Sequence, residues 1–101
     1  MKLYIAGKIT GEPDYYEKFQ RAVLKLRIDG HLVITPTILP DGLEHDEYMH
    51  ICYSLIDIAE GVYFLDNWTD SKGAIEEYRY ACHTGKKILF ERVAVEKTVT
   101  V

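Results

Sequence analysis

Glu77 is the carboxylate whose neighbours in the sequence are best spaced for chemistry. Gly73 and Ala74 stand four and three positions before it, so on a helix all three residues share one face. Glycine and alanine have almost no side chain, and this face therefore leaves a path from the start of the helix to the carboxylate. The spacing predicts that Glu77 touches a ligand held where the helix begins.

The residues before this helix predict what kind of ligand that is. The apolar run 62–65 is typical of a buried strand, and Asp70 or Ser71 can cap the helix that follows. Such a strand-to-helix junction presents free backbone N–H groups and the positive end of the helix dipole, which suit an anion. On a helical wheel Glu76 falls opposite the apolar side and is expected at the surface, whereas Glu77 borders that side. The junction predicts an anion site beside one functional carboxylate.

The composition narrows the classes of protein to which the chain can belong. With 101 residues, 48% of them hydrophobic and spread throughout, the sequence predicts one small folded domain. A net charge of −4 argues against a nucleic-acid polymer as partner, since proteins that bind one usually carry a basic face. No apolar run approaches the ~20 residues of a membrane span, and the N-terminus has no signal-peptide pattern. We therefore expect a cytoplasmic protein that binds a small molecule.

The cysteines and histidines do not indicate a metal site. Cys52 and Cys82 fall on apolar helix faces without a metal-ligand spacing, so we expect two reduced core residues. None of the histidines pairs with a cysteine or carboxylate at such a spacing. They are His31, His45, His50 and His83. We expect neither a metal nor an organic cofactor.

Short apolar runs alternate with helical patterns along the chain. Strands are expected at 3–6, 31–35, 62–65 and 87–91, and helices at 13–29, 46–59 and 72–83. This β-α-β-α-β-α-β order indicates an α/β domain, a Rossmann-like or flavodoxin-like parallel sheet of four to five strands with helices on both faces. Residues 1–91 would form the domain, and residues 92–101, which alternate apolar and polar types, would add a fifth strand or an arm.

Three loops of this predicted fold would meet at one edge of the sheet. Right-handed crossovers bring the loops that follow the strands to the carboxyl edge, where ligands of such sheets bind. These loops span residues 7–12, 36–46 and 66–72. The helix that carries Glu77 begins at the end of the third loop, so its junction is at the edge expected for a site.

Two stretches of the chain resemble the nucleoside 2-deoxyribosyltransferase superfamily. They are 3–11 (Leu-Tyr-Ile-Ala-Gly-Lys-Ile-Thr-Gly) and 71–77 (Ser-Lys-Gly-Ala-Ile-Glu-Glu). A small branch of uncharacterised bacterial and phage proteins in that superfamily carries a block similar to the Trp-x-x-Ser-x-Gly-Ala of residues 68–74. The likeness extends over residues 2–91.

The resemblance implies a role for each matching residue. Glu77 would be the nucleophile that attacks the anomeric carbon of a 2-deoxyribosyl group, and Tyr4 would support it. The base would leave, and the sugar would pass to another base or to water. The phosphate of a 5′-monophosphate would be held by the loop after Tyr4 and by the second motif, at Gly7, Lys8, Ile9, Thr10, Ser71 and Gly73.

Ser71 is the residue that favours a monophosphate over a nucleoside as substrate. Members of the superfamily that prefer nucleosides have an aspartate at this place. A carboxylate there would repel a phosphate, whereas a serine hydroxyl donates to it. Lys8 would add a cation close by.

The acid that protonates the leaving base departs from the superfamily pattern. The matching position is Tyr53, and Asp57 lies one turn further along the same helix. Asp57 points nearly opposite the apolar stripe of that helix, so we expect it in solvent. The predicted stripe is Tyr48, Cys52, Leu55 and Ala59. Asp66 lies just past the third strand at the carboxyl edge and is the favoured acid, with Asp57 next.

The sequence predicts an N-glycosidase or deoxyribosyltransferase that acts on 2-deoxyribonucleoside 5′-monophosphates through a covalent ester with Glu77. The alternatives are a non-catalytic nucleotide-binding module, such as a sensor or phage accessory protein, and a structural subunit. Trp68 can stack on a base or cover a hydrophobic edge, and Tyr4 can be an ordinary strand aromatic. A domain this small has few walls, so a homodimer or higher homo-oligomer is expected.

Overall fold

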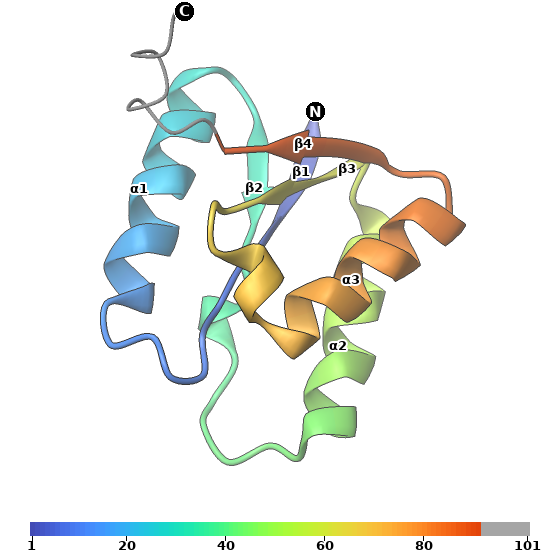
Figure 1. The fold of residues 1–101 in the computed structure, drawn as a ribbon. Coiled ribbons are helices and arrows are strands. Elements are labelled where there is room, and N and C mark those ends of the chain that lie inside the picture. The colour runs from blue at the N-terminus through green and yellow to red at the C-terminus, as the bar shows by residue number, and fades with distance from the viewer. Residues whose placement is uncertain (92–101) are drawn as a thin grey trace, which may run out of the picture.

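A computed structural model of the chain describes residues 1–91, and these form a four-stranded parallel sheet in the order β2-β1-β3-β4 (Figure 1). The strands are β1 (Lys2–Ala6), β2 (Leu32–Ile34), β3 (Gly61–Phe64) and β4 (Lys87–Phe90). The helices are α1 (Tyr15–Ile28), α2 (His45–Ile58) and α3 (Lys72–His83), with short 3-10 helices η1 (Pro36–Ile38) and η2 (Trp68–Asp70). The predicted α/β fold is confirmed. The strand or arm expected at 92–101 lies outside the described residues.

The two faces of the sheet are covered by different helices (Figure 1). Alternate residues of a strand point to opposite faces. Leu3 and Ile5 of β1 therefore pack in a core with α1, while Tyr4 and Ala6 pack in a second core with α2 and α3. The neighbouring strand β3 divides its side chains in the same way. The expectation of helices on both faces is confirmed.

Two sequence predictions about the helices are wrong in detail. Helix α1 begins at Tyr15 rather than Pro13, because the Tyr15 N–H first closes a turn on the Glu12 carbonyl (3.2 Å). Cys82, expected in the core, is exposed in the last turn of α3. Ala81 takes the buried position of that turn instead.

The buried side of α2 is also rotated from the predicted stripe. Met49, Cys52 and Ile56 are buried, whereas Tyr48 and Leu55 are half-buried at the margins. The reason is that α2 packs against the sheet and against α3 together, so more than one side of the helix is covered. This rotation brings Met49 toward the region where the functional residues lie.

Candidate functional site

A cavity of about 670 Å³ lies at the edge of the sheet where the strands end. Its walls come from the loop after β1 (8–10), the loop before α2 (40–43), the junction of η2 and α3 (70–73) and the first turns of α2. Each of the three predicted loops therefore contributes. The volume falls within the range of roughly 300 to 1,000 Å³ that is typical of small-molecule sites.

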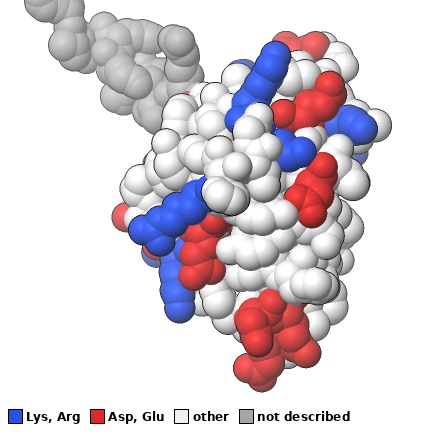
Figure 2. Space-filling model, turned by 90° about the vertical axis from the view of Figure 1, so that its right-hand side faces the viewer, with Lys and Arg blue, Asp and Glu red and all other residues white. Residues whose placement is uncertain are grey.

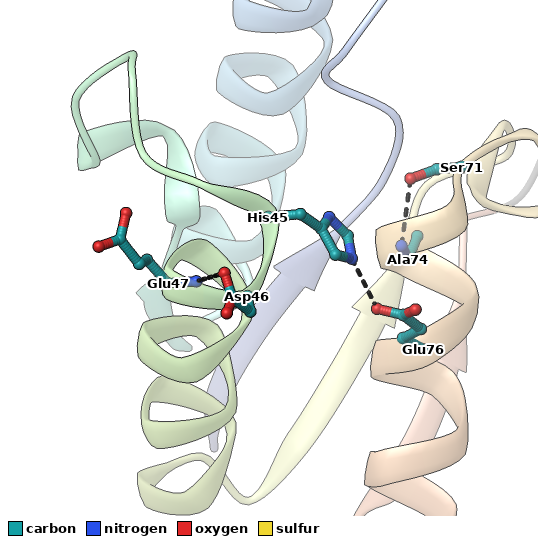
Figure 3. A network of polar contacts seen from close by, with 6 residues as sticks. All are labelled: His45, Asp46, Glu47, Ser71, Ala74 and Glu76. Carbon is teal, nitrogen blue, oxygen red and sulfur yellow. Dashed lines mark hydrogen bonds and ion pairs between the residues drawn. The ribbon is translucent and has the colours of Figure 1, made fainter.

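The start of α3 is arranged to receive an anion. Ser71 is the N-cap, and its Oγ accepts a hydrogen bond from the Ala74 N–H (3.1 Å; Figure 3). Ile75 donates the first bond to the Ser71 carbonyl, so the N–H groups of Lys72 and Gly73 precede the helical ladder. Because Ser71 Oγ is the acceptor of the bond from Ala74, the hydroxyl can still donate its own proton to a ligand. These donors and the helix dipole face the cavity.

The cavity lining carries charges of both signs. Lys8 and Lys72 contribute cationic side chains, and Asp41 and Asp70 contribute carboxylates. The backbone N–H of Lys8 donates to Oδ1 of Asn67 (3.2 Å), which ties the loop after β1 to the loop after β3. The lining suits a ligand with one anionic end and further polar groups elsewhere.

Glu77 is buried below this cavity. It is 4% exposed, and among residues 1–91 it is the one buried charged side chain. The hydroxyl of Tyr4, which is fully buried, donates a hydrogen bond of 2.5 Å to Oε2 of Glu77. Tyr4 belongs to β1 and Glu77 to α3, so this bond joins a strand and a helix that lie far apart in the sequence. The structure brings together the two residues that the resemblance to the superfamily paired.

The surroundings of Glu77 raise the pKa of its carboxyl into the neutral pH range. Burial raises the pKa of the Glu77 carboxyl from 4.5 to about 7, and the Tyr4 hydroxyl and Cys52 thiol oppose this rise by hydrogen bonding to the carboxylate. Burial also raises the pKa of the Cys52 thiol to about 12 and that of Tyr4 well above its usual range, so both groups stay protonated. A carboxyl that titrates near pH 7 is characteristic of catalytic groups.

Met49 lies against the helix face that the sequence predicted to be clear. A Cβ atom on Gly73 would be 3.5 Å from Sδ of Met49, which is an ordinary contact, and Met49 is itself 4% exposed. Met49 and Gly73 line the cavity, whereas Glu77 does not. The Met49 side chain therefore occupies the start of the path predicted along Gly73 and Ala74. The three rotatable bonds of methionine allow this side chain to move.

Two residues predicted to bind the ligand lie outside the cavity lining. Trp68 stacks on Tyr78, with ring centroids 4.9 Å apart, and its ring also lies 5.2 Å from that of Phe64. Of the two roles considered for Trp68, stacking on a base or covering a hydrophobic edge, these contacts correspond to the second. Gly7 is buried, and a Cβ atom there would be 2.7 Å from Leu65. Its lack of a side chain permits this close packing.

Asp66, the favoured acid, is also outside the lining. It is exposed, and its backbone N–H donates to Oε1 of Glu91 (2.9 Å). Its charge contributes to the raised pKa of Lys18, a residue of α1 whose main partner is Glu12. Asp66 therefore lies toward α1, whereas the cavity is bordered by α2 and α3.

Asp57, the second choice of acid, belongs to the far end of α2. It lies two turns beyond Met49, which corresponds to about 12 Å along the helix. Its Oδ1 accepts a 2.5 Å hydrogen bond from the Tyr80 hydroxyl. Tyr53, at the position that matches the superfamily's acid, stacks on the Tyr80 ring with centroids 4.3 Å apart. None of these three residues lines the cavity.

His45 and Glu76 form a pair that sequence reasoning missed. His45 is the first residue of α2 and lines the cavity, and its Nε2 is 2.9 Å from Oε1 of Glu76 on α3 (Figure 3). Glu76, which the helical wheel placed at the open surface, is half-buried. The available signal was the place of His45 at the end of the second loop, at the edge where ligands bind.

Residues 1–91 contain no group of three or more potential metal ligands among their histidines, cysteines and carboxylates. In the same part of the chain, no helix combines the length and the apolar character needed to cross a membrane.

Comparison with known proteins places the fold. Residues 1–90 match the family described as Domain of unknown function (DUF4406). The structure is similar to that of a 2-desoxiribosyltransferase from Leishmania mexicana, with a TM-score of 0.68 and 21% sequence identity. The alignment covers 95% of this chain and 69% of the other. The search of curated proteins finds no match. The predicted likeness to the deoxyribosyltransferase superfamily is confirmed for the fold.

Proposed function

The chain belongs to the DUF4406 family, and we propose that it is an N-glycosidase or deoxyribosyltransferase acting on 2-deoxyribonucleoside 5′-monophosphates. The observation that carries the proposal is the buried pair of Tyr4 and Glu77 below a cavity with an anion site. Burying a carboxyl costs stability, and the raised pKa of Glu77 reflects that cost. A catalytic role explains why a carboxyl is buried at this position, whereas a contribution to stability does not. The fold shared with a 2-desoxiribosyltransferase supports the same class of reaction.

The first step would be attack by the ionised Glu77 carboxylate on C1′ of the deoxyribose. Tyr4 hydrogen bonds to Oε2, which leaves Oε1 as the attacking oxygen. As the C1′–O bond forms, the C1′–N bond breaks, and its electron pair goes to the base, which takes up a proton and leaves.

The second step would release the sugar from the enzyme. Water, or a second base in a transferase, attacks C1′ and loses a proton. The ester bond to Glu77 breaks, and its electron pair returns to the carboxylate. With water as acceptor, the products are the free base and 2-deoxyribose 5-phosphate.

The 5′-phosphate would bind at the start of α3. The N–H groups of Lys72 and Gly73, the Ser71 hydroxyl and the Lys8 ammonium group all belong to the cavity lining and are the donors that a phosphate requires. Ile9 and Thr10 would complete the wall on the side of β1. An aspartate at position 71 would place a like charge in this site.

A non-catalytic nucleotide-binding module is the second candidate function. The observation in its favour is that Met49 and Gly73 line the cavity while Glu77 does not. A nucleotide could then fill the cavity without touching the carboxylate. Such a module would bind the same monophosphates and release no base.

We also propose that the chain acts as a homodimer or higher homo-oligomer, because one copy of so small a domain encloses a nucleotide incompletely. Residues 92–101 would contribute to that assembly. Light scattering at micromolar concentration should give a mass above that of one chain, and deletion of 92–101 should lower it. A monomer with undiminished base release would contradict the proposal.

The deciding experiment for the activity measures base release from the four common 2-deoxyribonucleosides and their 5′-monophosphates. We expect release from at least one monophosphate, with the matching nucleoside a poorer substrate. Glu77→Gln should lower the rate by on the order of 10³-fold or more, as loss of a nucleophile does. Glu17→Gln, an exposed glutamate of α1, is the matched control and should behave as the wild type.

The other outcomes separate the two candidate functions. A rise in melting temperature with a monophosphate, without base release, would favour the binding module, since a ligand of the native state stabilises it. Turnover unchanged by Glu77→Gln would contradict the catalytic assignment. Ser71→Asp should weaken binding of the monophosphate more than that of the nucleoside, and equal losses measured by calorimetry would contradict the phosphate site.

A further inference from the structure

The proposed reaction needs a proton donor for the leaving base. The two aspartates expected to supply it, Asp66 and Asp57, lie outside the cavity lining. The lining itself contains two other carboxylates, Asp41 and Asp70, and one imidazole, that of His45. A carboxylate accepts hydrogen bonds only, whereas an imidazole can hold a partner with one ring nitrogen and offer a proton to a ligand with the other. Imidazole is also the side chain that most often acts as a general acid.

His45 is held in place by a carboxylate from the facing helix. Its side chain extends from the first turn of α2 across to α3, where Nε2 is 2.9 Å from Oε1 of Glu76 (Figure 3). With Nε2 as donor to this carboxylate, Nδ1 is the nitrogen left to exchange a proton with a ligand. A carboxylate in this role fixes the orientation and the tautomer of the imidazole.

The position of His45 relative to Glu77 follows from the two helices. His45 and Met49 are one turn apart on α2 and share a face. Met49 contacts Gly73, and Gly73 is one turn before Glu77 on α3. His45 on α2 and Glu77 on α3 are therefore each one turn from the place where Met49 and Gly73 meet.

The charges around the cavity favour one orientation of the nucleotide. Acidic side chains gather at the lower end of the molecule in Figure 2, where α2 begins with Glu44, Asp46 and Glu47. They disfavour a phosphate beside the first turn of α2. The N–H groups at the start of α3, together with Lys8, favour it on the other side. The base end of the ligand is then the part directed toward α2.

We propose that His45, oriented by Glu76, is the general acid that protonates the leaving base. This inference rests on the proposed function. As the C1′–N bond breaks, its electron pair goes to the base, and the base takes the proton from Nδ1 of the imidazolium, which becomes neutral imidazole. In the second step the neutral imidazole accepts the proton that the attacking water loses. The histidine is thereby restored for the next turnover.

The experiment compares two substrates whose bases differ in their need for a proton. The first is 2′-deoxyguanosine 5′-monophosphate. The second is its 7-methyl derivative, whose cationic base leaves as a neutral molecule without being protonated. His45→Gln should lower kcat/KM for the first substrate by about 10² to 10⁴-fold, the usual contribution of a general acid. For the methylated substrate the loss should be less than about tenfold, because that step needs no acid.

Two further variants complete the test. Glu76→Gln, which keeps the size of the side chain and removes its charge, should show the same dependence on substrate with a smaller loss. His50→Gln changes an exposed histidine of the same helix outside the cavity lining and should leave both substrates unaffected. A melting-temperature shift with the unmethylated nucleotide verifies for each variant that the cavity still forms.

The outcomes keep the inference and the proposed function apart. Equal losses on both substrates in His45→Gln and Glu76→Gln would overturn the inference, because a purely structural role does not distinguish leaving groups. Full activity of both variants on the unmethylated substrate would overturn it as well. Absence of base release by the wild type from all four common monophosphates and from the methylated derivative would overturn the proposed function, and the inference with it.

Discussion

The two faces of the same sheet have different contents. The face toward α1 is an apolar core built around Leu3, Ile5 and Phe19, and its buried side chains carry no charge. The face toward α2 and α3 is equally buried, yet it contains the hydrogen-bonded pair of Tyr4 and Glu77. Adjacent residues of β1 thus enter an apolar core on one side and a site with a titrating carboxyl on the other.

This difference distinguishes residues that stabilise the fold from residues that form the candidate site. The buried side chains of the α1 face carry no charge, so the contribution of this core should depend little on pH. The α2/α3 face includes a carboxyl whose charged form is disfavoured, so its contribution should fall as the pH rises from 4.5 to about 7. Substitutions on the two faces should therefore be distinguishable by how their effects vary with pH.

The largest expected change in stability is on the α1 face. Phe19 is fully buried, and Phe19→Ala should lower the free energy of unfolding by about 3–5 kcal/mol. The loss should be the same at pH 5 and pH 8, because no titrating group is removed. Urea unfolding at both pH values measures it. A loss that differed strongly between them would contradict the separation of the two faces.

Glu77→Gln should change the free energy of unfolding in the opposite direction and stabilise the protein at neutral and higher pH. In the wild type the folded-state pKa of about 7 exceeds the unfolded value of 4.5, so the free energy of unfolding should fall as pH rises from 4.5 to 7. Glutamine removes this dependence and should make the protein more stable above pH 7 by about 3 kcal/mol. Below pH 4.5 the difference should vanish. A glutamine variant that is less stable at pH 8 would show that the charged form of Glu77 is favoured in the folded protein.

Tyr4→Phe sharpens the comparison within the second face. The Tyr4 hydroxyl lowers the pKa of Glu77 through its hydrogen bond, so its removal should raise that pKa. The ascending limb of kcat/KM against pH, which follows ionisation of the nucleophile, should move to higher pH. Loss of a hydrogen bond to a charged group should lower the rate at pH 6 by about tenfold. An unchanged limb with a lower plateau would mean that Tyr4 acts on the substrate rather than on Glu77.

The smallest expected effect concerns Gly73, where the two helices touch. A Cβ atom at this position would be 3.5 Å from Sδ of Met49, so Gly73→Ala should be accepted, with a gain in stability of about 0.5 kcal/mol from helix propensity. Gly73→Val is the matched test, because its extra methyl groups crowd Met49 and should lower base release several-fold more than alanine does. Thermal unfolding and turnover measure both. Equal turnover in the two variants would mean that Met49 need not move.

The order of elements could be predicted from the sequence, because the apolar strands are short and distinct and parallel strands leave few ways to connect them. The pairing of Tyr4 with Glu77 was implied by the resemblance to the superfamily and not by any local pattern. Met49 and the pair of His45 with Glu76 could not be predicted, because their positions depend on the angle between α2 and α3, which no local pattern determines. Trp68 was ambiguous because an aromatic ring suits a base and a hydrophobic edge equally well.

The most direct test of the central claim, that Glu77 is a nucleophile, is to trap the covalent ester. A monophosphate with fluorine on C2′ of an arabino sugar slows both steps, because the transition states have oxocarbenium character. After acid quenching during turnover, intact-protein mass spectrometry should show one added fluorinated sugar phosphate, and peptide mapping should locate it on Glu77. Base release without an adduct on Glu77, or an adduct on another residue, would contradict the account.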